Sequence, residues 1–241
     1  MANIKENLFH LLGVSEQVTS HKEKLVSFLG GFISIYLIFL ITNQFLGIAE
    51  AIYIIPSMGA SAVLLFAAPN VPFSQPWNVF GGHLISAIIG VACFQWIPDI
   101  HIAAAASVGI AIGVMYYTRC IHPPGGATAL AAVIGSSQIH DLGYMYVVIP
   151  VLINTVTILI VAVAFNGVLS WRSYPANLKS RKIKEGVSNS SNVKNNNAYP
   201  PIKHEDFVYA LSQIDSIVDI NEDDLQEIYG LATGRINLKQ K

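Results

Sequence analysis

A long stretch that carries almost no charge constrains this chain more than any other feature. Between residues 25 and 170 the formally charged side chains are Glu50, Asp99, Arg119 and Asp141, and lysine is absent. The whole chain is 53% hydrophobic and 12% charged, whereas soluble domains carry about 25% charged residues. We therefore predict an all-α, polytopic membrane protein. The net charge of −1 excludes the basic surface that nucleic-acid binding requires.

Uncharged runs that are long enough to cross a bilayer occur at residues 25–47, 79–97, 102–118 and 144–170. Lys22 and Lys24 precede the first run, and a basic cluster follows the last one: Arg172, Lys179, Arg181, Lys182 and Lys184. Because basic residues collect on the cytoplasmic side of membranes, we expect both termini to be cytoplasmic. The expected location is the cell inner (plasma) membrane, crossed several times.

Two shorter segments repeat one another. Pro56-Ser57-Met58-Gly59-Ala60-Ser61-Ala62-Val63-Leu64 has the pattern of the later stretch His122-Pro123-Pro124-Gly125-Gly126-Ala127-Thr128-Ala129-Leu130. Each copy predicts a half-helix that starts after a proline and extends for about 12 residues. Such a helix is about 18 Å long, less than the roughly 30 Å of hydrocarbon. Short segments with proline and glycine at matching places in two halves are a pointer to a transporter's binding site.

The number of crossings stays open between four and six. Four spans with two re-entrant motifs would make the repeat parallel, and six spans would make it inverted. Arg119 lies on the cytoplasmic side in the six-span arrangement and on the far side in the other. The positive-inside rule slightly favours six spans.

The sequence divides into four regions. We expect a cytoplasmic N-terminal segment that is either a surface helix or a loose tail, a transmembrane domain, a basic linker rich in asparagine and serine, and a C-terminal helical segment. These regions are residues 1–24, 25–171, 172–204 and 205–241, respectively.

The motif that begins with His122-Pro123-Pro124-Gly125-Gly126 resembles the HPP family of small integral membrane proteins, which takes its name from that tripeptide. The resemblance extends to Gly59-Ala60-Ser61-Ala62-Val63-Leu64, to the stretch from Gln75 to His83, and to the order of the apolar segments over residues 20–172. It implies four transmembrane helices and, because plastid and cyanobacterial relatives are implicated in nitrite transport, a nitrite-related function. Some bacterial relatives continue into nucleotide-sensing CBS modules, whereas this chain ends after helices similar to those that precede such modules.

The two predicted half-helices suggest an anion site. A helix N-terminus exposes free backbone N–H groups and a partial positive charge of about half a unit. Two such ends meeting inside the membrane would hold a small monovalent anion without any lysine. The residues expected to add donors or to permit close backbone approach are Ser57, Gly59, Ser61, Gly125, Gly126 and Thr128. The alternative is that these small residues only pack helices together.

Four further side chains are candidates for substrate binding. His122 either contacts substrate and carries a proton or caps a neighbouring carbonyl, and His83 is favoured as a core histidine over a cavity residue. Arg119 is the one basic residue of the membrane region, and it either has a functional role or reaches to the lipid headgroups. Asn154 is expected to bond another helix, with substrate contact as the second choice.

These observations favour transport over catalysis. No nucleophile, base and acid occur in a recognisable pattern, the scattered histidines make no metal site, and Cys93 and Cys120 have no paired spacing. We therefore expect no cofactor and no enzymatic activity. The expected function is transport of a small inorganic anion, with nitrite favoured, and the expected surroundings are the lipid bilayer and, as an open option, further copies of the chain. The alternative is a membrane-anchored sensor or scaffold that acts through its C-terminal helices.

Overall fold

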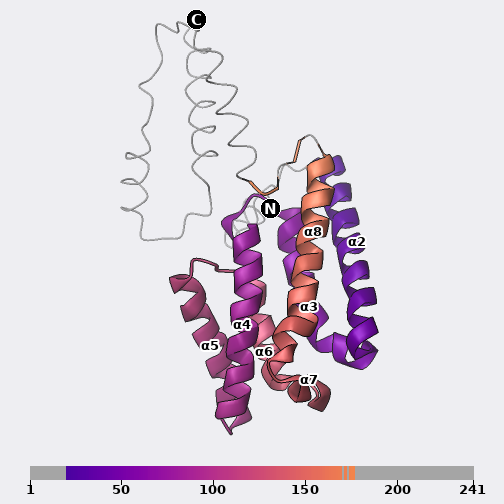
Figure 1. The fold of residues 1–241 in the computed structure, drawn as a ribbon. Coiled ribbons are helices and arrows are strands. Elements are labelled where there is room, and N and C mark those ends of the chain that lie inside the picture. The colour runs from indigo at the N-terminus through magenta and orange to yellow at the C-terminus, as the bar shows by residue number, and fades with distance from the viewer. Residues whose placement is uncertain (1–19, 170, 173, 177–241) are drawn as a thin grey trace, which may run out of the picture.

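The computed structural model describes residues 20–169, 171–172 and 174–176, and these residues form helices without any strand (Figure 1). The all-α, polytopic prediction is confirmed, because five of the helices are long and apolar enough to cross a membrane. The predicted N-terminal segment up to residue 19, the linker beyond residue 176 and the C-terminal helices lie outside the described residues. The elements are α2 (His21–Leu46), α3 (Ile48–Ala67), η1 (Pro72–Ser74), α4 (Pro76–Trp96), α5 (Ile100–Tyr117), α6 (Pro123–Ile134), α7 (Ser137–Leu142), η2 (Val147–Leu152) and α8 (Ile153–Val168).

Short polar side chains and prolines set where the helices begin. The Ser20 hydroxyl accepts a hydrogen bond from the Glu23 N–H at 3.2 Å, and the Asp99 carboxylate accepts two from the first turn of α5, at 2.9 and 3.0 Å. These are N-caps, which satisfy backbone donors that have no partner within the helix. Pro76 starts α4 and Pro123 starts α6, positions at which the missing N–H of proline costs nothing.

The helices alternate in direction, and the contacts between their ends define two ends of the bundle. At one end, which we call the Arg172 end, Arg172 pairs with Glu23 at the start of α2. The Ser27 hydroxyl donates to the carbonyl of Phe66 near the end of α3, and the Trp77 indole N–H at the start of α4 donates to the carbonyl of Thr118 after α5. Six segments therefore alternate in direction, five of them long enough to cross a membrane and one of them, α6, a shorter helix of 12 residues (Figure 1). They are α2, α3, α4, α5, α6 and the pair η2–α8.

The arrangement of these segments makes the repeat inverted, because α3 runs toward the Arg172 end and α6 runs away from it. The second predicted half-helix exists, since α6 has 12 residues and begins at Pro123. The first prediction is wrong: Pro56 lies inside α3, a continuous helix of 20 residues that begins at Ile48. One proline removes a single backbone donor, and membrane helices tolerate this loss.

The last predicted span, residues 144–170, is also not one uninterrupted helix. Ile149 has non-helical dihedral angles, φ −123° and ψ 109°, directly before Pro150. The residue before a proline is driven out of the helical region by the proline ring. The broken segments of this bundle are therefore η2–α8 and the non-helical stretch that precedes α6.

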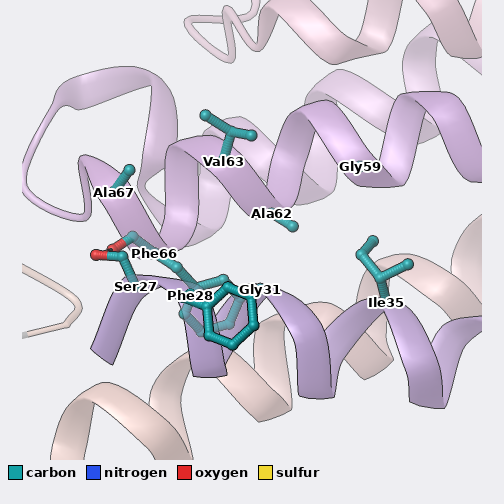
Figure 2. A pocket seen from close by; sticks show the side chains of 9 residues that line it. All are labelled: Ser27, Phe28, Gly31, Ile35, Gly59, Ala62, Val63, Phe66 and Ala67. Carbon is teal, nitrogen blue, oxygen red and sulfur yellow. Dashed lines mark hydrogen bonds between the residues drawn. The ribbon is translucent and has the colours of Figure 1, made fainter. Parts of the chain in front are cut away.

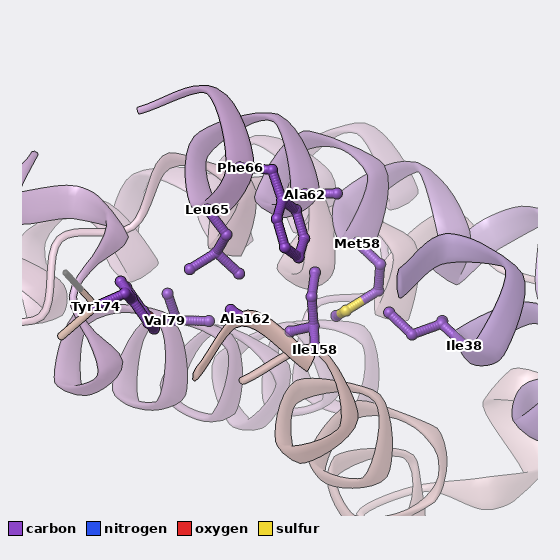
Figure 3. Close-up of a cluster of buried hydrophobic side chains, with 9 residues drawn as sticks. All are labelled: Ile38, Met58, Ala62, Leu65, Phe66, Val79, Ile158, Ala162 and Tyr174. Atoms are coloured by element: carbon purple, nitrogen blue, oxygen red, sulfur yellow. The ribbon is translucent and has the colours of Figure 1, made fainter. Parts of the chain in front are cut away.

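The helices pack in two different ways, through large apolar side chains on one side of the bundle and through glycines and other small residues on the other side. On the first, α2, α3, α4 and α8 enclose Met58, Leu65, Phe66 and Ile158 together with neighbouring apolar side chains (Figure 3). On the second, α4 and α6 run in the same direction in close contact, as the glycines of α4 show. A Cβ on Gly90 would collide with the carbonyl oxygen of Ala129, and one on Gly82 would lie 2.5 Å from the Cβ of His122.

Arg172, which the sequence indicated only as a member of the basic cluster after the last span, is buried in the bundle. Only 7% of its surface is exposed, and its guanidinium donates to the Glu23 carboxylate, to the side-chain oxygens of Asn166 and Ser27 and to the carbonyl of Phe66. These contacts join the end of α8, the start of α2 and the end of α3. The planar fork of arginine is suited to several fixed acceptors at once, so Arg172 closes this end of the bundle.

Candidate functional site

A buried cluster of two histidines and two hydroxyls lies between α3, α4 and α6. His83, His122, Ser61 and Thr128 all have no exposed surface. The Ser61 hydroxyl oxygen lies 2.8 Å from Nε2 of His83 and 2.8 Å from Nε2 of His122. The two rings meet edge to face with their centroids 4.8 Å apart. A single hydroxyl thus joins both imidazoles in the interior of the membrane domain.

The outer nitrogens of the two rings also have partners. Nδ1 of His83 lies 2.7 Å from the Thr128 hydroxyl, and Nδ1 of His122 lies 2.7 Å from the carbonyl oxygen of Phe73 in η1. The chain Thr128–His83–Ser61–His122–Phe73 is therefore continuous. We call it the histidine chain.

Two local features place His122 in this chain. It is the N-cap of α6 and is followed by two prolines, which keep its backbone extended at φ −140° and ψ 102°. Gly82 on α4 lets the His122 backbone approach closely, because any side chain there would occupy the same space as the His122 Cβ. The sequence His-Pro-Pro therefore ends the non-helical stretch and holds the imidazole against α4.

The carbonyl of Phe73 fixes the proton positions of the neutral chain, because a carbonyl only accepts. His122 must donate from Nδ1 and accept at Nε2. The Ser61 hydroxyl has two acceptors within reach, Nε2 of His122 at 2.8 Å and the Ser57 carbonyl at 3.1 Å, and in the continuous chain it donates to the nearer one, His122. Ser61 then accepts from Nε2–H of His83, whose Nδ1 in turn accepts from the Thr128 hydroxyl. In this arrangement every contact of the chain has one donor and one acceptor.

Two further buried hydroxyls, those of Tyr146 and Thr155, were not among the residues predicted from the sequence. The Tyr146 hydroxyl donates to the Thr128 carbonyl at 3.0 Å. Thr155 on α8 carries the one buried side-chain oxygen or nitrogen that has no hydrogen-bond partner in the described part of the chain. Thr155 lies within about one turn of Val151 and Ile158, which pack around Ile54 and Met58 of α3, so it faces the segment of α3 that leads to Ser61. Its position directly after Asn154 in an apolar span was the available signal.

Some predicted residues lie away from the histidine chain. Gly59 and Gly126 would accept a side chain without a close contact, since the nearest atom to a Cβ on Gly126 is Val108 Cγ1 at 3.7 Å and none lies within 4 Å of one on Gly59. The close approach expected at Gly126 occurs at Gly125 instead, where a Cβ would lie 2.7 Å from the carbonyl oxygen of Gly82.

The remaining candidates also have defined surroundings. Arg119 is exposed after the end of α5, with a positive φ of 55°. The Asn154 side chain exchanges hydrogen bonds with the Thr42 hydroxyl on α2 at 2.8 and 3.0 Å, which is a bond between helices. Ser57 donates to the carbonyl of Ile54 in its own helix at 2.9 Å, and its carbonyl lies 3.1 Å from the Ser61 hydroxyl.

The expected pair of free helix ends is not present. The motif of α3 lies within a continuous helix, and at the start of α6 both Pro123 and Pro124 lack an N–H. The next donor, the N–H of Gly125, bonds the carbonyl of His122 at 2.8 Å. Side-chain groups of the histidine chain, and not backbone N–H groups, are thus the polar groups that these motifs bring together.

A cavity of about 300 Å³ lies between α2 and α3, away from the histidine chain (Figure 2). Its lining is apolar apart from Ser27, and there is open space beside Gly31 and Gly59, since no atom lies within 4 Å of a Cβ built on either glycine. A groove of this composition suits an acyl chain or a neighbouring helix. We therefore place the candidate site at the histidine chain, where the polar groups are.

The fold and the buried polar cluster define a polytopic α-helical membrane protein with polar groups at membrane depth. The chain matches the HPP transmembrane region over residues 16–175 and belongs to this family. It is similar to two transmembrane proteins of Dictyostelium discoideum. The first relative is 38% identical over 153 residues, which cover 62% of this chain and 49% of the relative. The second is 37% identical over 131 residues, which cover 53% of this chain and 46% of that relative. The chain thus spans about half the length of these relatives, and no solved structure matches it.

Proposed function

We propose that this protein transports a small monovalent anion across the membrane, with nitrite as the favoured substrate, and that it is not an enzyme. The observation that carries the proposal is the histidine chain. Ionisable side chains inside a membrane domain are rare and costly, and they mark substrate pathways, ion pathways and proton relays. A single pair of polar side chains, such as Asn154 and Thr42, is enough to hydrogen-bond two helices together, whereas this cluster contains two imidazoles and two hydroxyls.

The unpartnered hydroxyl of Thr155 supports a ligand at this depth. A buried hydroxyl without a hydrogen bond costs about 1–3 kcal/mol, and an oxygen atom of a bound anion would remove this cost. Thr155 lies on α8, which packs against α3 through Ile158 and Met58, and the break in η2–α8 at Ile149 precedes it by six residues. Non-helical backbone at membrane depth occurs where it is buried in protein or lines a cavity.

The scarcity of fixed charge favours a singly charged ion. Hydroxyl and imidazole donors offer partial charges, whereas the desolvation cost of an anion rises steeply with its charge. We therefore expect nitrite, nitrate, chloride or formate to be carried in preference to sulfate.

Thr155→Val should have opposite effects on flux and on stability. Valine keeps the shape of threonine but removes the unpartnered hydroxyl, so the melting temperature in detergent should rise. Nitrite flux into liposomes should fall by about tenfold, which corresponds to the loss of about 1.4 kcal/mol of interaction with the anion. Thr157→Val is the matched control, because Thr157 donates to the Ile153 carbonyl of its own helix. Unchanged flux in a stabilised Thr155 variant would remove this residue from the site, and absence of flux in the parental protein would remove the transport proposal.

We also propose that the Arg172 end faces the cytoplasm, since Lys22 and Lys24 lie at the start of α2 at this end and the sequence that follows Arg172 is basic. Arg119 and His101 are exposed near opposite ends of α5. In intact cells, a membrane-impermeant maleimide should label a His101→Cys variant and leave an Arg119→Cys variant unlabelled. Both should react after permeabilisation, and the reverse pattern would mean the opposite orientation.

A further inference from the structure

We propose that the histidine chain loads one proton for each anion carried, so that transport is a proton–anion symport. This inference rests on the proposed transport function and names its coupling ion. It follows from the geometry of the chain, which has two complete sets of hydrogen bonds that differ by one proton.

The first set is the neutral one, in which each group donates toward Phe73. A proton that arrives at the Thr128 hydroxyl starts a transfer along the chain. The Thr128 O–H proton moves to Nδ1 of His83, the Nε2–H proton of His83 moves to the Ser61 oxygen, and the Ser61 O–H proton moves to Nε2 of His122. Each O–H or N–H bond that breaks is matched by one that forms, and no electron is exchanged.

The second set is again satisfied. His122 now carries protons on both nitrogens, donating from Nδ1 to the Phe73 carbonyl and from Nε2 to Ser61. The Ser61 hydroxyl donates to Nε2 of His83, and Nδ1–H of His83 donates to the Thr128 hydroxyl. Thr128 donates to the Pro124 carbonyl, which lies 3.4 Å away. The charge of the added proton resides on the His122 imidazolium.

This imidazolium has no carboxylate partner within residues 20–169. The acidic side chains there are Glu23, Glu50, Asp99 and Asp141. Glu23 is paired with Arg172, Glu50 lies 11 residues before Ser61 on α3, about 16 Å along the helix, and the two aspartates lie near the opposite end of the bundle. A buried charge requires a partner, so an anion from solution is what balances the loaded state.

The other titratable groups around the pair do not supply that charge. Tyr146 faces it through the Thr128 carbonyl, with its hydroxyl as a donor, and Cys120 packs against Gly81 on α4 and contacts the Thr118 hydroxyl. Arg119 is exposed. The segments η1, η2 and α8 contain no titratable side chain. The proton and the anion therefore enter the site together or not at all.

The test is a flux assay on the full chain in liposomes, with a luminal pH dye and with the membrane potential set by potassium and valinomycin. Nitrate is the main probe because it has no neutral acid at neutral pH, nitrite is the second, and protein-free liposomes give the background. We expect lumen acidification of one proton per anion and a flux that does not depend on the potential. His83→Gln and His122→Gln keep a polar amide but cannot relay a proton, and each should lower coupled flux at least about tenfold.

The outcomes separate the two proposals. Anion flux that follows the membrane potential without acidification would overturn the symport and leave anion transport standing. Flux absent for every anion would overturn both. Parental coupling in a folded His122→Gln variant, with the melting temperature as the check on folding, would also overturn the relay. A second readout is the ¹⁵N signal of labelled histidine, in which a nitrate-dependent protonation of His122 Nε2 is expected and its absence contradicts the proposal.

Discussion

Replacement of Gly125 by alanine is expected to destabilise the protein severely, whereas the same change at the adjacent Gly126 is not. A Cβ on Gly125 would lie 2.7 Å from the Gly82 carbonyl oxygen and 2.8 Å from the Ser86 hydroxyl oxygen. Because the first of these atoms is backbone, α4 and α6 would have to move apart, and such overpacking costs about 1–3 kcal/mol or more. The separation would also move His122 away from Ser61.

Gly126→Ala is the matched control within the same turn of α6. Its Cβ meets only Val108 at 3.7 Å, and alanine in a helix is favoured over glycine by about 0.8–1.0 kcal/mol. In detergent, thermal unfolding should therefore show a lower melting temperature for Gly125→Ala than for the parent and an equal or higher one for Gly126→Ala. Equal melting temperatures for the two variants would mean that Gly125 of α6 does not lie against the Gly82 carbonyl of α4.

The sequence predicts the long helices well because their signal is additive. Each of the four predicted long runs contains many apolar residues, and no single side chain decides the result. The first three predicted runs began two to four residues after the true helix starts, because the caps Ser20 and Asp99 and the proline Pro76 that set those starts were not considered. The alternation of helix direction then follows from short connections between consecutive spans.

Proline was the residue whose effect the sequence could not decide. Pro56 lies within a continuous helix, Pro150 interrupts one, and Pro123 begins one. A single proline in a membrane helix removes one backbone bond, which neighbouring groups compensate. In contrast, consecutive prolines at 123 and 124 hold both His122 and Pro123 to conformations compatible with a helix start only. The resemblance of the two motifs in sequence therefore did not make them alike in structure.

The residues of the candidate site could be predicted from the sequence, but the hydrogen bonds between them could not. Ser61, His83, His122 and Thr128 were all candidates from the sequence, and the structure brings them into one chain. Their pairing depends on the rotation of α3, α4 and α6 about their axes, which apolar periodicity determines poorly when both faces of a helix are apolar. For the same reason Thr155 and the contacts of Arg172 were missed, since both depend on distant segments.

Ser61 is the residue on which the proposed mechanism depends most. Its hydroxyl oxygen is within hydrogen-bond distance of both histidines, and the two ring nitrogens that it contacts are the ones that exchange a proton in the relay. Ser61→Ala places an apolar methyl group between them. Two buried ring nitrogens then lose their partner, at a cost of about 1–3 kcal/mol for each unsatisfied group, and the proton has no path from His83 to His122.

Ser61→Ala should therefore lower proton-coupled nitrate flux at least about tenfold, while Ser57→Ala, one turn earlier on α3, should stay close to the parental rate. The Ser57 hydroxyl donates only to the Ile54 carbonyl of its own helix, so its loss breaks no contact between helices. Ser61→Thr restores a hydroxyl at the same position and should recover part of the flux, which a purely structural defect in the alanine variant would not predict. If folded Ser61→Ala protein carries nitrate with one proton at the parental rate, the proton does not travel through this hydroxyl, and the two histidines are joined for stability alone.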